Sequence, residues 1–177
     1  METALQSHIL RRDSTNLDLV LPQVLSLSNQ IFSADLSSKY ASLPIWKERL
    51  SHESSMIIYL TAPTQDGGIV TAVDKPIAFL FLHPRMHSPP WVDGTKITLH
   101  IWLAGVLPYW RKAGCLHRMM KEVMTAPDST YTICTRPSLF PDMWTWLLRR
   151  GWKREMSLGE DKVMLSKRSV PVQHYLR

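Results

Sequence analysis

The stretch from Thr98 to Met124 constrains the fold of this chain more than any other, because it contains the signals for a strand, a turn and a helix in succession. Residues 98–106 are largely apolar on both faces of an extended segment, as in a strand buried on two sides. Pro108 then ends the strand, because proline has no N–H to donate to a ladder. After Gly114, apolar residues recur at helical spacing, at Leu116, Met119, Met120 and Val123.

The loop between this strand and this helix is suited to bind an anion. It contains Arg111 and Lys112, and it leads directly into the first turn of the predicted helix. The amides of a first helical turn lack intrahelical partners and lie at the positive end of the helix dipole. The sequence therefore predicts a phosphate-binding loop here.

Residues 106–116, VLPYWRKAGCL, resemble the acyl-CoA-binding motif of the GNAT superfamily of N-acyltransferases, V-x-P-x-x-[QR]-x-x-G-x-[GA]. The resemblance implies that backbone amides of this loop hold the CoA pyrophosphate, with acetyl-CoA or another short acyl-CoA as cosubstrate. The cofactor-binding residues that it implies are Val106, Arg111, Lys112, Ala113, Gly114, Cys115 and Leu116. Arg111 and Gly114 stand at the expected spacing. Leu116 departs from the motif, which has Gly or Ala there. A larger side chain can be accommodated at this position if it points into the core, but the departure weakens the match at the last amide.

Residues 146–152, WLLRRGW, resemble a second GNAT signature, L-Y-x-K-x-G-F. Leu147 falls where that signature has a tyrosine, which in many members is proposed to protonate the leaving thiolate. The chain therefore lacks the usual acid. Tyr131 and Cys134 are possible replacements, although a buried tyrosine and a buried thiol at such positions are more often structural.

The order of elements predicts an α/β (α+β) chain with the GNAT fold, over about residues 8–168. We expect a mixed central sheet of six to seven strands, a splay between the fourth and fifth strands, and about four helices around it. The expected strands are 8–12, 55–61, 75–83, 98–106, 131–135, 152–158 and 162–167, and the expected helices are 17–32, 43–50, one following Gly114, and 140–150. The 177 residues suit a single domain with a loose tail at 169–177.

Three details of these elements are also predicted. Pro22 favours a break within the first helix, and Ser138 is suited to cap the last one. Residues 83–94 are rich in proline and predict an irregular loop. We expect it to form a substrate lip, because Met86 and Trp91 are unfavourable in water.

Composition excludes several classes of function. No apolar run is long enough to cross a bilayer and no signal peptide is present, so we expect a soluble, cytoplasmic protein without membrane contact. Two cysteines, Cys115 and Cys134, form neither a disulfide framework nor a metal cluster. The net charge of +6 raises nucleic-acid binding as an alternative. The basic residues are spread along the chain, however, and favour a solvated surface that attracts polyanionic CoA.

The chemistry implied by the resemblance is attack of an amine on the acyl thioester. The acceptor amine must lose a proton, and the thioester oxyanion must be stabilised, which the family does with a backbone N–H at the position of Val106. His100 is our candidate base, because its usual pKa lies near neutrality and arylalkylamine N-acetyltransferases have a histidine at a similar position. A histidine on a buried strand is also often a core residue with a satisfied hydrogen bond.

Aromatic residues favour a small, planar or apolar amine as the acceptor. Trp46, Trp91, Trp102 and Trp144 fall in segments that would surround the acceptor in a GNAT fold, and His83 and His87 flank the proline-rich loop. The sequence leaves open a monomer or a homodimer. It also leaves open two alternatives to N-acetyl transfer, namely different chemistry on a bulky apolar metabolite and a non-catalytic acyl-CoA-binding module.

Overall fold

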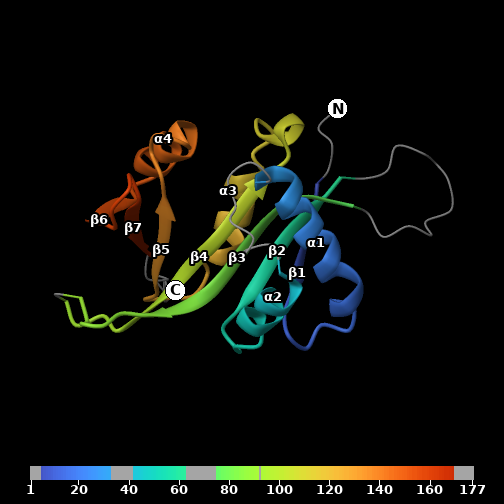
Figure 1. Cartoon of the computed structure of the whole chain (residues 1–177), viewed down its shortest axis with the longest axis horizontal. Coiled ribbons are helices and arrows are strands. Elements are labelled where there is room, and N and C mark those ends of the chain that lie inside the picture. Colours follow the sequence, from blue (N-terminus) through green and yellow to red (C-terminus); the bar gives the residue numbers. More distant parts are fainter. Residues whose placement is uncertain (1–4, 33–41, 63–74, 92, 170–177) are drawn as a thin grey trace, which may run out of the picture. The chain divides into compact units, whose positions relative to one another are not determined.

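The computed structural model describes residues 5–32, 42–62, 75–91 and 93–169. Seven strands form one mixed sheet in the order β1-β2-β3-β4-β5-β7-β6 (Figure 1). The chain separates into two compact units, residues 1–83 with 103–123 and residues 84–102 with 124–177. Strands β3 and β4 each run through both units.

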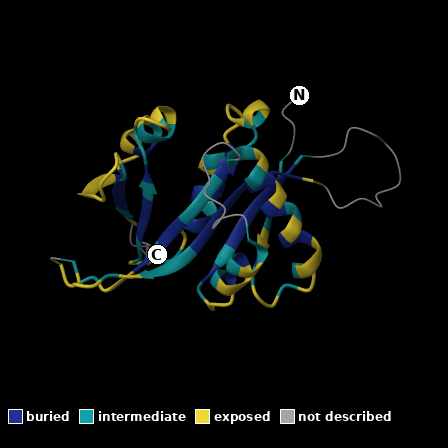
Figure 2. Ribbon diagram, in the orientation of Figure 1, coloured by how far each residue is buried: buried dark blue, intermediate teal, exposed yellow. Residues whose placement is uncertain are grey.

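The first unit contains antiparallel strands with two helices before β2 and one after β4. Its elements are β1 (Gln6–Leu10), α1 (Leu17–Phe32), α2 (Leu43–Leu50), β2 (Met56–Thr61), most of β3 (Pro76–Met86), the end of β4 (Ile97–Val106), the short 3-10 helix η2 (Pro108–Trp110) and α3 (Cys115–Val123). β2 pairs antiparallel with both β1 and β3. Its residues are almost all buried, as Figure 2 shows in dark blue.

Aromatic side chains form the centre of the first unit. Trp46 of α2 is fully buried, and its ring centroid lies 5.7 Å from that of Phe79 and 5.2 Å from that of Phe81. On β4, a Cβ at Gly105 would lie 2.9 Å from Ile31 Cδ1 and 3.1 Å from Phe79 Cε1. Glycine at this position therefore lets α1 and β3 pack closely against the end of β4.

The second unit is built around three further strands and one helix. These are β5 (Thr130–Thr135), α4 (Pro141–Arg149), β6 (Lys153–Ser157) and β7 (Val163–Arg168). β5 runs parallel to β4 over three residue pairs, which end at Ile101 and Ile133. β7 is antiparallel to both β5 and β6. The short parallel ladder agrees with the predicted splay between the fourth and fifth strands.

The predicted fold class is confirmed: the described residues form a mixed seven-stranded sheet with four α-helices, and each element falls within a few residues of its predicted range. The predicted break at Pro22 is wrong, because α1 is continuous from Leu17 to Phe32. Proline removes only one hydrogen bond, and the buried residues on both sides of it hold the helix against the sheet.

The predicted cap of α4 is also wrong. The N-cap residue is Phe140, which makes no side-chain cap hydrogen bond, whereas Pro141 occupies the first turn as expected. Ser138 instead donates its backbone N–H to Asp161 at 2.7 Å. Gly151, with φ +79°, ends this helix as predicted.

The proline-rich loop is shorter than predicted, because β3 continues to Met86. The strand can include Pro84 because successive backbone N–H groups along β3 face opposite edges. The His87 amide donates to Lys96 across the hairpin, so the nitrogen of Pro84, three residues earlier, faces the opposite edge. Pairing with β2 already ends there at Leu82, so no ladder bond is lost.

The ends of the proline-rich loop differ in their exposure. Met86 is 73% exposed, so the expectation that it avoids water is wrong, whereas Trp91 is half-buried. Ser169, the first residue of the predicted loose tail, is held in place, because its backbone N–H donates to the Ser129 carbonyl at 3.0 Å. Residues 170–177 lie outside the part of the chain that is described.

Candidate functional site

The predicted phosphate loop follows β4 in the first unit. The Leu107 amide donates to Ile77 at 3.0 Å and fixes the end of the strand, and η2 follows it. The Gly114 carbonyl accepts the first helical hydrogen bond, from the amide of Arg118 at 3.0 Å. Gly114 is therefore the N-cap of α3, and the amides that follow it belong to the open first turn.

The backbone at Gly114 explains why glycine stands there. Its φ is +74°, a region that other residues adopt at a cost, and a Cβ built on it would meet nothing within 4 Å. The space over this glycine is open, and residues 111–114 are all exposed. The Arg111 Nε donates to the Val106 carbonyl at 3.5 Å, which ties the arginine to the strand end. A polyanion fits this combination of open backbone, helix terminus and two cations.

The two residues after Gly114 differ in burial. Cys115 is buried and its thiol donates to the Trp110 carbonyl at 3.5 Å, and burial raises the pKa of this thiol. Leu116, where the resembled motif has Gly or Ala, is half-buried. The buried face of α3 is centred on Cys115, Met119 and Val123, which are spaced by four residues.

His100 belongs to the second unit, where it is 6% exposed. In the β4–β5 ladder it is opposite Thr132, and its Nδ1 lies 2.9 Å from Thr132 Oγ1. Thr132 Oγ1 lies 3.0 Å from Thr98 Oγ1, on the same face of β4 as His100. His100 is thus held in place on a rigid strand rather than on a loop.

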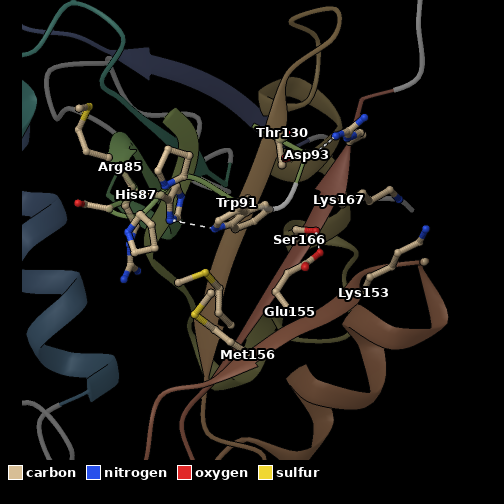
Figure 3. Close-up of a pocket in the computed structure, with 17 residues that line it drawn as sticks. Arg85, His87, Trp91, Asp93, Thr130, Lys153, Glu155, Met156, Ser166 and Lys167 are labelled. Atoms are coloured by element: carbon tan, nitrogen blue, oxygen red, sulfur yellow. Dashed lines mark hydrogen bonds and ion pairs between the residues drawn. The ribbon is translucent and has the colours of Figure 1, made fainter. Parts of the chain in front are cut away.

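The second unit also has a hollow of about 1110 Å³, formed by the β3–β4 hairpin together with β5, β6 and β7 (Figure 3). Apolar side chains make up part of its wall: Met86, Pro89, Pro90, Trp91, Met156 and Met164. The remaining wall is polar or charged and includes Arg85, His87, Asp93, Lys153, Glu155, Ser166, Lys167 and Arg168. This mixture of apolar area and a few placed polar groups is typical of a site for a small ligand.

Glu155 is brought to this hollow by an irregularity in β6. The register between β6 and β7 shifts between Arg154 and Met156, so Glu155 is the additional residue of a β-bulge. Its carboxylate accepts a hydrogen bond from the Ser166 hydroxyl. Figure 3 shows Glu155 and Ser166 directed toward each other inside the hollow.

Most charges in the wall have partners. Arg168 pairs with Asp93, and hydrogen bonds from Thr95 lower the pKa of the Asp93 carboxyl. Lys167 donates to the Arg150 carbonyl at 2.6 Å. These contacts order the rim of the hollow around Glu155.

His87 and Trp91 form one corner of the hollow. Their ring centroids lie 4.8 Å apart, and the indole Nε1–H of Trp91 donates to His87 Nδ1 at 3.1 Å. Burial, and then the nearby Arg85 guanidinium, lower the pKa of His87. Of the two histidines that we expected beside the loop, His87 lines this hollow, whereas His83 contacts Arg49 in the first unit at 3.0 Å.

The surroundings of Tyr131 and Cys134 favour neither as a replacement for the signature tyrosine. Leu147 is fully buried, and Tyr131 is fully buried too, which raises the pKa of its phenol. Cys134 is half-buried, and its sulfur lies 3.5 Å from Arg85 Nη1. Of the tryptophans expected around the acceptor, Trp46 is a core residue, whereas Trp91 lines the hollow.

Sequence reasoning missed Glu155, Arg85 and Ser166, because none belongs to a motif. Within the described ranges, no group of three His, Cys, Asp or Glu side chains could hold a metal ion. In the same ranges, no helix has the length and apolar character needed to cross a membrane.

Comparison with known proteins shows similarity in structure only. No protein-family profile and no curated protein matches the sequence. Among solved structures, Arabidopsis thaliana NAA60 in complex with a bisubstrate analogue has a TM-score of 0.58 at 10% identity, covering 93% of this chain and 99% of that one. The aminoglycoside N-acetyltransferase AAC(6')-Iy in complex with CoA has a TM-score of 0.61 at 14% identity, covering 88% and 92%.

A third match is a putative acetyltransferase of the GNAT family from Desulfovibrio desulfuricans, with a TM-score of 0.60 at 15% identity over 94% of this chain and all of that one. These matches extend over most of the chain and agree with the strand order and the parallel β4–β5 pair. The chain therefore has the fold of the GNAT acetyltransferases.

Proposed function

We propose that this chain transfers an acetyl or other short acyl group from acyl-CoA to a small-molecule amine. The observation that carries the proposal is the loop at Gly114, where a positive φ, open space and the first turn of α3 occur together beside Arg111 and Lys112. Solved structures with this fold include one in complex with CoA and one with a bisubstrate analogue, which supports acyl-CoA as the ligand.

In this proposal the loop holds the CoA phosphates. The amides after Gly114 would donate to phosphate oxygens, and Lys112 would add a nearby positive charge. Acyl-CoA supplies the activated thioester. The protein needs no metal for this chemistry, since attack by an amine requires positioning, proton management and stabilisation of the oxyanion.

The hollow of the second unit is the proposed acceptor site. Its methionines and Trp91 suit an apolar or aromatic body, and the Glu155 carboxylate suits an ammonium group. An amine arrives in its protonated form at neutral pH, so a carboxylate in the site would select it before it loses its proton. The acceptor would thus be a small amine with an apolar portion.

A release assay for free thiol tests this function. The purified chain is incubated with acetyl-CoA and a panel of small amines, and CoA is detected with a thiol-reactive dye. We expect turnover with apolar amines, and we expect Glu155→Gln to raise KM for the amine about ten-fold. The matched control is Glu160→Gln, because Glu160 pairs with Arg136 outside the wall of the hollow. Equal effects of both substitutions would contradict the assignment of the acceptor site.

One observation favours a second candidate, a non-catalytic acyl-CoA-binding module. Leu147 is fully buried where the resembled signature has a tyrosine, so this position contributes no proton to a leaving thiolate. This candidate predicts binding of acetyl-CoA without release of thiol for any amine. The same assay therefore separates the two functions.

A further inference from the structure

Five side chains of the second unit form a continuous hydrogen-bond chain between the hollow and His100. Trp91 Nε1 lies 3.1 Å from His87 Nδ1, and His87 Nε2 lies 2.8 Å from Thr98 Oγ1. Thr98 Oγ1 lies 3.0 Å from Thr132 Oγ1, which lies 2.9 Å from His100 Nδ1. Figure 3 shows the first of these contacts at the edge of the hollow.

The direction of this chain is fixed at its outer end. An indole N–H can only donate, so His87 Nδ1 must accept from Trp91. A neutral imidazole carries one proton, which His87 therefore holds on Nε2. The Nε2–H then donates to Thr98 Oγ1, so the Thr98 hydroxyl hydrogen is left to donate to another acceptor.

The same direction of donation continues through the two threonine hydroxyls toward His100. Thr98 is 2% exposed and Thr132 is fully buried, so each hydroxyl must satisfy its hydrogen within the protein. The arrangement that gives both hydroxyl hydrogens an acceptor within this chain has Thr98 donating to Thr132 and Thr132 donating to His100 Nδ1. The reversed chain would make both nitrogens of His87 acceptors, leaving that ring without a proton. A chain in which His87 and Thr132 both donate to Thr98 would leave the Thr98 hydrogen without an acceptor in the chain.

We propose that Trp91 and His87 are positioning residues that fix the tautomer of His100, with the proton on Nε2 and the Nδ1 lone pair bonded to Thr132. Neutral His100 then presents a hydrogen-bond donor at Nε2 rather than a lone pair. This changes the role predicted from the sequence, because such a tautomer cannot take a proton at Nε2. In the acyl transfer proposed above, on which this last step rests, His100 would act as a hydrogen-bond donor rather than as a general base.

The tautomers can be measured directly. Long-range 1H–15N NMR of the uniformly 15N-labelled full chain, slightly above neutral pH, distinguishes protonated from unprotonated ring nitrogens. The signals are assigned by their loss in His87→Gln and His100→Gln. We expect protonated Nε2 and unprotonated Nδ1 in both residues. A protonated Nδ1 in His100, or an average of the two tautomers, would overturn the proposal.

Variants test the direction of the relay. Trp91→Phe keeps the ring and removes the donor, so we expect both histidines to become tautomer mixtures. Trp146→Phe is the control: Trp146 of α4 packs against the Arg150 guanidinium, so this substitution should leave both tautomers unchanged. Thr132→Val cuts the chain next to His100, so His100 should change while His87 keeps its tautomer. Unchanged His100 spectra in both Trp91→Phe and Thr132→Val would refute the relay.

These results are independent of whether the protein is an acyltransferase. The tautomers are read in the absence of acyl-CoA, whereas the thiol-release assay and acetyl-CoA titration test the function. A fixed tautomer together with no turnover would uphold the relay and contradict the proposed function. Turnover with a mixed His100 tautomer would do the opposite.

Discussion

Replacement of Gly114 by alanine should affect both the stability of the fold and the affinity for acetyl-CoA. At φ +74° an alanine is strained by about 1–2 kcal/mol, and no protein atom lies within 4 Å to add a clash. For a chain of this size that loss corresponds to a Tm lower by roughly 2 to 8 °C. The methyl group also projects into the open space proposed for the CoA phosphate. We expect acetyl-CoA affinity to fall about ten-fold or more, which is ~1.4 kcal/mol of binding free energy.

Gly159→Ala is a matched control for this substitution. Gly159 has φ +82° and likewise has no atom within 4 Å of the built Cβ, but it lies between β6 and β7 in the second unit, outside the wall of the hollow. Its alanine variant should lose a similar amount of stability and keep the affinity of the original chain. Thermal unfolding gives the stability, and isothermal titration calorimetry gives the Kd. Equal affinities in Gly114→Ala and Gly159→Ala would refute the assignment of the phosphate loop.

Three further predictions concern the core and the two histidines. Trp46→Ala empties the space between Phe79 and Phe81 and should lower the free energy of unfolding by about 3–5 kcal/mol in urea titrations; a loss below about 1 kcal/mol would contradict the core assignment. The lowered pKa of His87 means that the unfolded chain takes up a proton first as pH falls, so stability is retained above the usual histidine pKa near 6.5 and lost as pH falls through the folded value. His87→Gln should therefore flatten the dependence of Tm on pH between about pH 7 and pH 5, and an unchanged slope would contradict this account. His100→Ala removes the imidazole N–H donor and should lower kcat for acyl transfer by about 10²-fold with little change in acetyl-CoA affinity, whereas unchanged kcat would exclude a catalytic role for His100.

The fold was predictable from the sequence because local signals and length agreed along the chain. Apolar periodicity identified the helices. Pro108 marked the end of β4, and Gly114 marked the start of α3. The continuous α1 was not predictable, because the local cost of Pro22 is outweighed by packing that only the folded sheet supplies. The partial exposure of Leu116 was not predictable either, because it depends on the exact residue at which α3 begins.

The candidate site was predictable only in its loop. That loop is contiguous in sequence, so its spacing could be read directly. The relay joins Thr98 to Thr132, which are 34 residues apart, and it depends on the exact register of β4 and β5. Glu155 reaches the hollow through a bulge, and no pattern of residue types in β6 indicates that shift.

The central claim is that this chain binds acyl-CoA through the loop at Gly114. Calorimetric titration of the purified full chain with acetyl-CoA, and separately with free CoA, tests it most directly. The account predicts one site with a Kd on the order of micromolar, about −8 kcal/mol, for both ligands, and a raised Tm in their presence. The absence of binding heat and of any thermal shift with either ligand would contradict it.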